Sequence, residues 1–174
     1  MCNNFARVCK RVSVSKVYRS LFRFGIETDT LDPEGQITAT SQVIPTRAQI
    51  EAILPSLTGE VEIEVPKFSA VHINGKRAYD LARNGVDFKS PTKIVNVYRF
   101  EIISSPKLVN DWFEIECQTG TYIRSLAKLL AQKLGTVAIA QEIIRTRVGN
   151  FKIEDAKSPD HVALENILPV GGII

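Results

Sequence analysis

The sequence predicts a mixed α+β fold, formed by one domain that spans all 174 residues. Residues 92–103 and 112–117 alternate apolar and polar side chains, as half-buried strands do. Residues 122–134 instead carry apolar side chains at helical spacing. Strands interspersed with helices are typical of α+β domains. A chain of this length buries roughly 70% of its unfolded surface, which is enough for one hydrophobic core.

The first third of the chain predicts a strand, a loop and a helix. Residues 13–25 alternate loosely and indicate a strand, and residues 27–35 are dense in turn-forming side chains. Thr46 and Gln49 stand at the spacing of a capping box, which predicts a helix that continues to about Leu57.

The middle of the chain predicts two short strands and a tight turn. Residues 61–65 and 68–73 have strand character, and Pro66 separates them. The Asn74-Gly75 pair is a turn signal.

Four further elements follow along the chain. A short helix is expected from Lys76, with Gly85 just beyond its end. The strands at 92–103 and 112–117 are expected to form a hairpin across 107–110. Residues 137–151 indicate a strand or a strand pair, and Ser158 is a candidate cap for a last helix.

The helix predicted at 122–134 carries an arginine, Arg124, in its first turn. The N-terminal end of a helix has partial positive charge, so a cation there needs a compensating partner. One interpretation is a surface arginine that extends into water. The other is a guanidinium directed at a carboxylate or a phosphate in a pocket, for which its rigid fork of donors is suited.

Composition excludes several classes of protein. The chain is 44% hydrophobic and 24% charged, which argues against disorder. No apolar run approaches the roughly 20 residues that span a membrane, and no signal peptide is visible. The net charge of +3 permits an anionic partner without requiring one.

The cysteines and histidines do not predict a zinc site. Cys2, Cys9 and Cys117 form no CxxC pair, and His72 and His161 lie far from them in sequence. An odd number of cysteines fits a reducing compartment, so a cytoplasmic location is expected.

Three sequence blocks stand in a recognisable order. The first runs from K-V-Y-R at 16–19 through F-G at 24–25 to T-D-T-L-D-P-E-G at 28–35. The second is P-K-F-S-A-V-H-I-N-G-K-R-A-Y-D-L-A-R-N-G at 66–85. The third is G-T-Y-I-R-S-L at 120–126, followed by L-G at 134–135 and R-T-R-V-G-N-F at 145–151.

Together the three blocks resemble the TruB family, the tRNA pseudouridine-55 synthases. The resemblance covers about residues 16–151 and implies a pseudouridine synthase fold, with a mixed, mainly antiparallel sheet flanked by helices. It implies an isomerase that flips a uridine out of the T-loop of tRNA, detaches the base, rotates it and rejoins it through C5. It also implies tRNA as the partner through its T-arm stem-loop, a monomeric state, and no cofactor, metal or membrane.

The resemblance also implies roles for individual residues. Tyr18 matches the tyrosine that stacks on the base and takes part in proton abstraction, and Arg124 matches the arginine that pairs with the catalytic aspartate. Tyr122 and Ile144 match pocket residues, for which ordinary core packing is the alternative. The residues that match substrate-binding positions, with a solvated surface as the alternative, are Lys67, Ser69, His72, Lys76, Arg77 and Arg145.

The chain departs from the family pattern at the nucleophile. The family places its aspartate upstream of the tyrosine block, in G-T-L-D-P-x-A-x-G, whereas the seventeen residues before Tyr18 include no Asp or Glu. Asp32 sits in a partial copy of that motif but downstream of Tyr18, so it is expected not to be the nucleophile. Arg124 is therefore expected to lack its carboxylate. The chain is expected to be a partial catalytic domain over 1–174, truncated at its N-terminus and without a PUA domain.

Two other functions remain open at this point. The chain is either part of an isomerase or a catalytically dead RNA-binding remnant, for example a tRNA chaperone module. A fragment without function is the third alternative.

Overall fold

One antiparallel sheet of six strands forms the body of the molecule. The computed structural model describes residues 14–73, 75–107 and 110–156. The strand order is β10-β9-β1-β8-β7-β4, and each neighbouring pair is antiparallel. The strands are β1 (Lys16–Phe24), β4 (Gly59–Glu64), β7 (Thr92–Lys107), β8 (Asn110–Cys117), β9 (Ala138–Val148) and β10 (Phe151–Lys152). The α+β prediction is confirmed.

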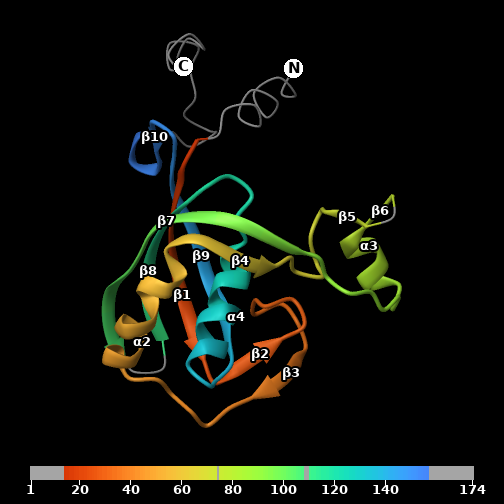
Figure 1. Cartoon of the computed structure of the whole chain (residues 1–174), viewed down its shortest axis with the longest axis horizontal. Coiled ribbons are helices and arrows are strands. Elements are labelled where there is room, and N and C mark those ends of the chain that lie inside the picture. The colour runs from red at the N-terminus through yellow and green to blue at the C-terminus, as the bar shows by residue number, and fades with distance from the viewer. Residues whose placement is uncertain (1–13, 74, 108–109, 157–174) are drawn as a thin grey trace.

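The helices of the body cover one face of this sheet (Figure 1). They are α2 (Arg47–Ile53), the 3-10 turn η1 (Leu54–Leu57) and α4 (Ile123–Lys133), and a second 3-10 turn, η2 (Ile153–Asp155), follows β10. Between sheet and helices lies a core in which the rings of Phe22, Phe100 and Phe113 pack against one another at centroid distances of 4.7–6.1 Å. Among the helices described, none has the length and apolarity needed to cross a bilayer.

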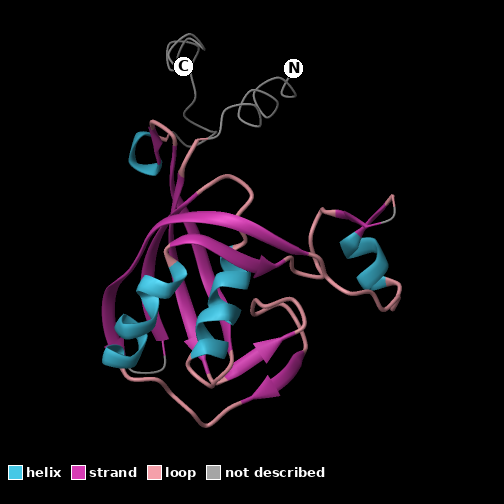
Figure 2. Ribbon diagram, viewed as in Figure 1, coloured by secondary structure: helices cyan, strands magenta, loops and turns pink. Residues whose placement is uncertain are grey.

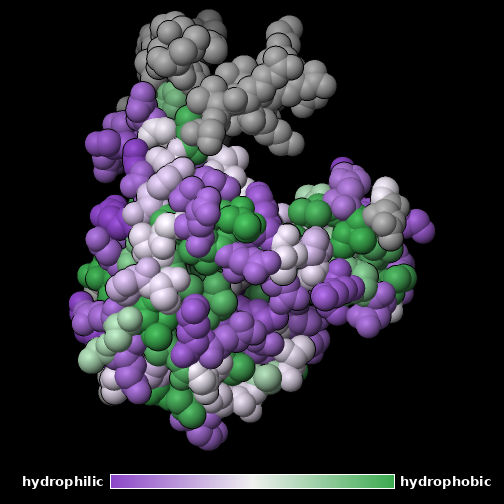
Figure 3. Space-filling view, in the orientation of Figure 1, coloured by the Kyte–Doolittle hydropathy of each residue, from purple (hydrophilic) through white to green (hydrophobic). Residues whose placement is uncertain are grey.

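Two small hairpins stand outside the main sheet. Strands β2 (Ile26–Thr28) and β3 (Ile37–Thr40) flank the loop that contains the T-D-T-L-D-P-E-G motif. Strands β5 (His72–Ile73) and β6 (Lys76–Arg77) join helix α3 (Ala78–Arg83) in a module, residues 66–91, that projects from the body (Figure 2). Hydrophilic side chains gather where this module meets the body (Figure 3).

Local signals account for most of the elements. The Thr46–Gln49 capping box is present in both directions, as predicted. The helix predicted to end near Leu57 is α2 followed by η1, because Pro55 stands at the start of the 3-10 turn. The hairpin between β7 and β8 is confirmed, with Lys107 opposite Asn110.

Two predictions need correction, and one strand was not predicted. The strand expected over 68–73 is reduced to β5, because the chain after Pro66 bends away from the sheet and follows the module. The helix expected from Lys76 begins two residues later, since Lys76 and Arg77 pair with β5 instead. Strand β3 lies in a stretch for which no element was predicted. The helix proposed at Ser158 lies outside the described residues, as does Asn74.

Gly25 provides a test of how β1 turns into the β2–β3 hairpin. Its φ is +89°, and an added Cβ would lie 3.0 Å from the Ser41 carbonyl oxygen, whereas Gly59 has φ +90° with open space around it. We expect Gly59→Ala to lower the free energy of unfolding by about 1 kcal/mol through backbone strain alone. Gly25→Ala adds a clash with backbone and is expected to cost about 1–2 kcal/mol more. Urea unfolding of both variants measures the difference, and equal losses would contradict this account.

Candidate functional site

Arg124 has the compensating partner that its position in the first turn of α4 requires. Its Nη1 donates to Asp32 Oδ2 at 2.8 Å and to the Thr30 carbonyl at 2.7 Å, and its Nη2 donates to the Phe68 carbonyl at 3.0 Å. The side chains of Arg124 and Asp32 are only 22% and 25% exposed. The carboxylate also lies near the positive end of the helix dipole, which favours it. The expectation that Arg124 is an unpaired cation is therefore wrong, because Asp32 supplies a carboxylate partner.

The loop before Asp32 is folded so that two neighbouring acceptors converge on one guanidinium nitrogen. Leu31, between them, has φ +62°, in the left-handed region that non-glycine residues rarely adopt. This reversal directs the Thr30 carbonyl and the Asp32 carboxylate toward the same Nη1. The Leu31 carbonyl is itself fixed to the sheet by the Ala140 N–H at 3.1 Å.

The carboxylate of Asp32 is occupied on both oxygens. Thr30 Oγ1 and the Glu34 N–H donate to Oδ1 at 2.6 and 3.1 Å, while Arg124 takes Oδ2. Thr28 Oγ1 adds a bond of 2.6 Å to the Asp32 carbonyl. A carboxylate held by this many donors is suited to anchoring a guanidinium rather than to attacking a substrate.

Tyr18 lies on β1 and packs, half-buried, against the core. Burial raises the pKa of its hydroxyl above the usual value, the nearby Cys117 raises it further, and Arg145 opposes both through its charge and a hydrogen bond. The phenol is consequently neutral at physiological pH. It retains a proton while its ring offers a flat surface.

The strand register corrects one of the predicted pocket residues. Arg145 lies opposite Tyr18 and so shares its face of the sheet, whereas Ile144 lies opposite Arg19, one residue along, and faces the other side. Ile143, opposite Ser20, is the isoleucine on the face of Tyr18. Two adjacent isoleucines in the sequence cannot be told apart until the bulges in the β1–β9 pairing fix the register.

Two further predicted residues lie close to Arg124 in the chain or in space. Tyr122 immediately precedes α4 and packs partly buried against the core. Ser69 follows Phe68, whose carbonyl accepts a hydrogen bond from Arg124. The buried hydroxyl of Ser69 has no hydrogen-bond partner among the described residues. A buried, unpaired hydroxyl is costly, so a ligand atom at Ser69 would be favoured.

The remaining predicted residues gather on the projecting module. His72 pairs with Arg77 across the β5–β6 hairpin, and Lys76 lies next to Arg77 on β6. Three basic side chains therefore share one exposed hairpin. Lys67 at the root of the module forms an ion pair of 3.1 Å with Asp87. The guanidinium of Arg77 lies over the ring of Tyr79 in α3, 6.0 Å from the ring centroid.

Sequence reasoning missed the partnership of Asp32 with Arg124. The cation in the first turn did signal that a carboxylate or phosphate lies nearby. The two residues are 92 positions apart, however, and only the folded chain brings them together. Within residues 14–156, apart from the undescribed positions 74 and 108–109, no cluster of three potential metal ligands occurs.

A double-mutant cycle measures how strongly this ion pair holds the loop to α4. We expect Asp32→Asn and Arg124→Gln to show a coupling free energy of about 1–2 kcal/mol in urea unfolding, because the pair is three-quarters buried. The control is Arg47 and Glu51 of α2, whose 2.7 Å pair is about half exposed on both sides. That pair is expected to couple by about 0.5 kcal/mol or less. Equal coupling in the two cycles would show that burial adds nothing.

Cys117, beside Tyr18, makes the folded state sensitive to alkali. Burial raises the pKa of its thiol from 9.0 to about 11, so the unfolded chain ionises first as the pH rises. The free energy of unfolding should therefore be intact below pH 9 and fall between pH 9 and about 11, by up to about 2 kcal/mol. Cys117→Val should flatten this fall, and parallel pH profiles for the two proteins would contradict the assignment.

Comparison with known proteins gives a consistent result. The family model described as "TruB family pseudouridylate synthase (N terminal domain)" matches residues 1–123. The chain is 42% identical over 156 residues to "tRNA pseudouridine synthase B" of Caulobacter vibrioides, covering 90% of the chain and 49% of that protein. It is 44% identical over 148 residues to the protein of the same name in Borreliella afzelii, covering 83% of the chain and 52% of that protein. The chain spans about half the length of these curated relatives.

Solved structures show the same fold. A "Cbf5-Nop10-Gar1 Complex" matches with a TM-score of 0.57 at 24% identity, over 82% of this chain and 33% of the matched chain. An "H/ACA RNP bound to a substrate RNA containing 2'-deoxyuridine" matches with a TM-score of 0.55 at 20% identity, over 86% and 33%. The family model covers more than half of the sequence. This chain belongs to the TruB family of pseudouridylate synthases.

Proposed function

We propose that this chain is part of a tRNA pseudouridine synthase of the TruB type, which isomerises the T-loop uridine-55 of tRNA. The observation that carries the proposal is the fixed Arg124 guanidinium, held by Asp32 and two carbonyls at the start of α4. An enzyme that works on a base inside folded RNA must extrude it and read it in a pocket. A guanidinium fixed in advance does not have to be ordered when the base arrives.

Each side chain then has a separate task. Arg124 keeps an attacking carboxylate ionised and oriented, because a guanidinium offers donors in a rigid fork. Tyr18 stacks on the flipped base and, with its proton retained by burial, takes part in the proton transfer at C5. Tyr122 and Ile143 line the pocket as its aromatic and apolar walls. No cofactor or metal takes part.

The module at residues 66–91 binds the RNA. Its exposed hairpin and root present cations to the phosphates of the T-arm, contacts that position the RNA without reading its sequence. Ser69 supplies a hydroxyl and Arg145 a further cation beside Tyr18. The substrate-binding set comprises Lys67, Ser69, His72, Lys76, Arg77 and Arg145. We propose that the protein acts as a cytoplasmic monomer.

The attacking carboxylate comes from elsewhere than Asp32. Both oxygens of Asp32 are occupied, and the residues before Tyr18 include no Asp or Glu. The G-T-L-D-P pattern of the family does not occur in these 174 residues. By itself the chain is a module of the enzyme that binds RNA without isomerising it.

Tritium release from a T-arm stem-loop containing 5-tritiated uridine tests both halves of this proposal. With the chain in excess over RNA, we expect binding without release, because the carboxylate that Arg124 contacts, that of Asp32, is held on both oxygens. Release above background would show that a residue of this chain attacks the base, and Asp32→Ala would then identify it.

The binding half needs its own control. The double variant with Lys76→Gln and Arg77→Gln should bind the RNA more weakly. The slope of log K against log salt concentration should become shallower by the amount that about two phosphate contacts contribute. Arg47→Gln removes an exposed arginine of α2, far along the chain from the module, and should leave binding unchanged. Binding that is absent, or that is insensitive to salt, would contradict an RNA-binding role.

A further inference from the structure

The projecting module carries the whole of the chain's net positive charge. Residues 66–91 contain five lysines and arginines and two aspartates, a surplus of three cations that equals the net charge of +3 of the entire chain. The rest of the chain is therefore balanced between acidic and basic side chains. Because a local surplus of cations attracts polyanions, an anionic partner is drawn to the module.

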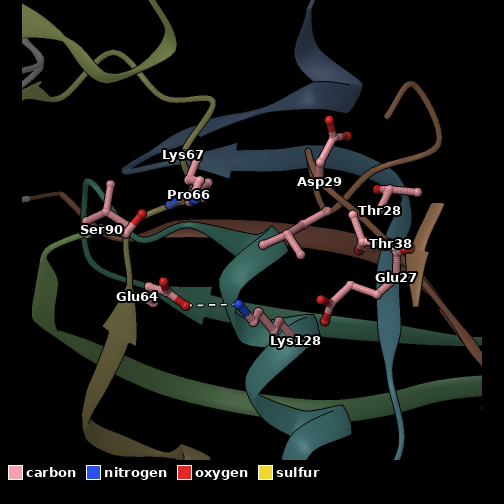
Figure 4. A pocket seen from close by; sticks show the side chains of 11 residues that line it. Glu27, Thr28, Asp29, Thr38, Glu64, Pro66, Lys67, Ser90 and Lys128 are labelled. Atoms are coloured by element: carbon pink, nitrogen blue, oxygen red, sulfur yellow. Dashed lines mark hydrogen bonds and ion pairs between the residues drawn. The ribbon is translucent and has the colours of Figure 1, made fainter. Parts of the chain in front are cut away.

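Two lysines at the root of the module have acidic partners. They border a cavity of about 270 Å³ beside the T-D-T-L-D loop (Figure 4). Lys67 forms its ion pair of 3.1 Å with Asp87, and Lys128 of α4 forms one of 2.9 Å with Glu64. Carboxylates thus hold both of these ammonium groups and offset part of their charge.

Two arginines of the module are held by an aromatic ring instead of by a carboxylate. The guanidinium of Arg83 lies 5.6 Å from the ring centroid of Tyr79, and that of Arg77 lies 6.0 Å from the same centroid. Within the described part of the chain neither arginine forms an ion pair, although Asp80 follows Tyr79 directly. A ring orders a guanidinium without cancelling its charge. Both arginines therefore keep their charge and their donors for a ligand.

The ring that holds these arginines is itself connected to the site around Arg124. The Tyr79 N–H donates to the Ser69 carbonyl at 3.1 Å, and the carbonyl of the preceding residue, Phe68, accepts from Arg124 at 3.0 Å. The Tyr79 side chain is half-buried, whereas Arg77 and Arg83 are exposed. Backbone contacts thus set the position of the ring relative to Arg124.

We propose that Arg77, Tyr79 and Arg83 form a clamp for neighbouring phosphates of one RNA strand. In this clamp Arg83 is a further phosphate-binding residue, and Tyr79 is a positioning residue that acts through the two guanidiniums. The rigid fork of a guanidinium matches the oxygens of a phosphate. Two like charges beside one ring repel each other, and an anion between them relieves this repulsion. Such contacts position the RNA without reading its sequence.

The phosphates belong to the RNA of the proposed function, so the clamp rests on that function in this respect. Free polyphosphate offers the same chemistry. The test therefore has one arm with the T-arm stem-loop and one with inorganic triphosphate.

In the RNA arm, binding of the stem-loop is measured over a range of salt concentrations. Tyr79→Leu should weaken binding by about 3-fold, the scale of exposed cation–π contacts, because both arginines lose the ring that orders them. The slope of log K against log salt concentration should keep its wild-type value, since no cation is removed. Unfolding of the module would instead make that slope shallower by several phosphate contacts. Tyr79→Phe keeps the ring and should bind as the wild type does.

The arginines are tested in the same assay. Arg83→Gln should make the slope shallower by the amount that one phosphate contact contributes. Once Arg77→Gln and Arg83→Gln are combined, adding Tyr79→Leu should change nothing more, because no guanidinium remains for the ring to order. Tyr98→Leu, the same change at an exposed tyrosine of β7 outside the module, should leave binding unchanged. A wild-type slope for Arg83→Gln, or equal affinities for Tyr79→Leu and Tyr79→Phe, would overturn the clamp and leave the proposed function standing.

In the second arm, NMR follows the Cδ protons of Arg77 and Arg83 while inorganic triphosphate is added. Both signals should move together in the wild type and in Tyr79→Phe, and Tyr79→Leu should need about 3-fold more triphosphate for the same change. Movement with RNA but not with triphosphate would show that the clamp needs the phosphates of a strand. If the stem-loop does not bind at all, the proposed function fails. The triphosphate titration then decides alone, and identical curves for Tyr79→Leu and Tyr79→Phe would overturn the clamp.

Discussion

The ion pair between Arg124 and Asp32 is the contact on which the arrangement of the site depends. It joins α4, which packs on the sheet, to the loop between β2 and β3, and the same guanidinium also holds the Phe68 carbonyl at the root of the module. One partly buried cation thus ties three separate segments together. Because a planar guanidinium can donate in several directions at once, no lysine could replace it here.

That contact comes with local strain that the surrounding structure absorbs. Leu31 adopts a left-handed conformation, which costs on the order of 1–2 kcal/mol for a residue with a side chain. The Ala140 N–H and the burial of the Leu31 side chain hold it in place. Strain of this kind persists where neighbouring contacts over-determine the backbone, and such places concentrate at functional sites. Here the strained conformation brings two acceptors, the Thr30 carbonyl and the Asp32 carboxylate, to one nitrogen of Arg124.

The cavity beside this loop and the surroundings of Tyr18 differ in chemistry. Tyr18 is half-buried against the core, with Arg145 as its polar neighbour. The cavity instead is lined by charged and hydroxyl side chains of the β2–β3 hairpin and of the two connections of the module. Since both connections contribute, a ligand bound there would also restrain the module relative to the body.

The sequence by itself determined the class of fold and the main elements, because alternation, helical spacing, capping residues and turn signals act over a few positions. The strand β1, the helix α4 and the Thr46 cap follow from such local patterns. The resemblance to the family rests instead on the three sequence blocks. Only the tertiary structure decided which residues meet. It gave Arg124 its partner Asp32, 92 residues away, and it turned Ile143 rather than Ile144 toward Tyr18 through bulges in the β1–β9 pairing. It also shortened the strand after Pro66, because that segment leaves the sheet to build the module. Long-range pairing and strand register are properties of the packed chain, and no local pattern encodes them.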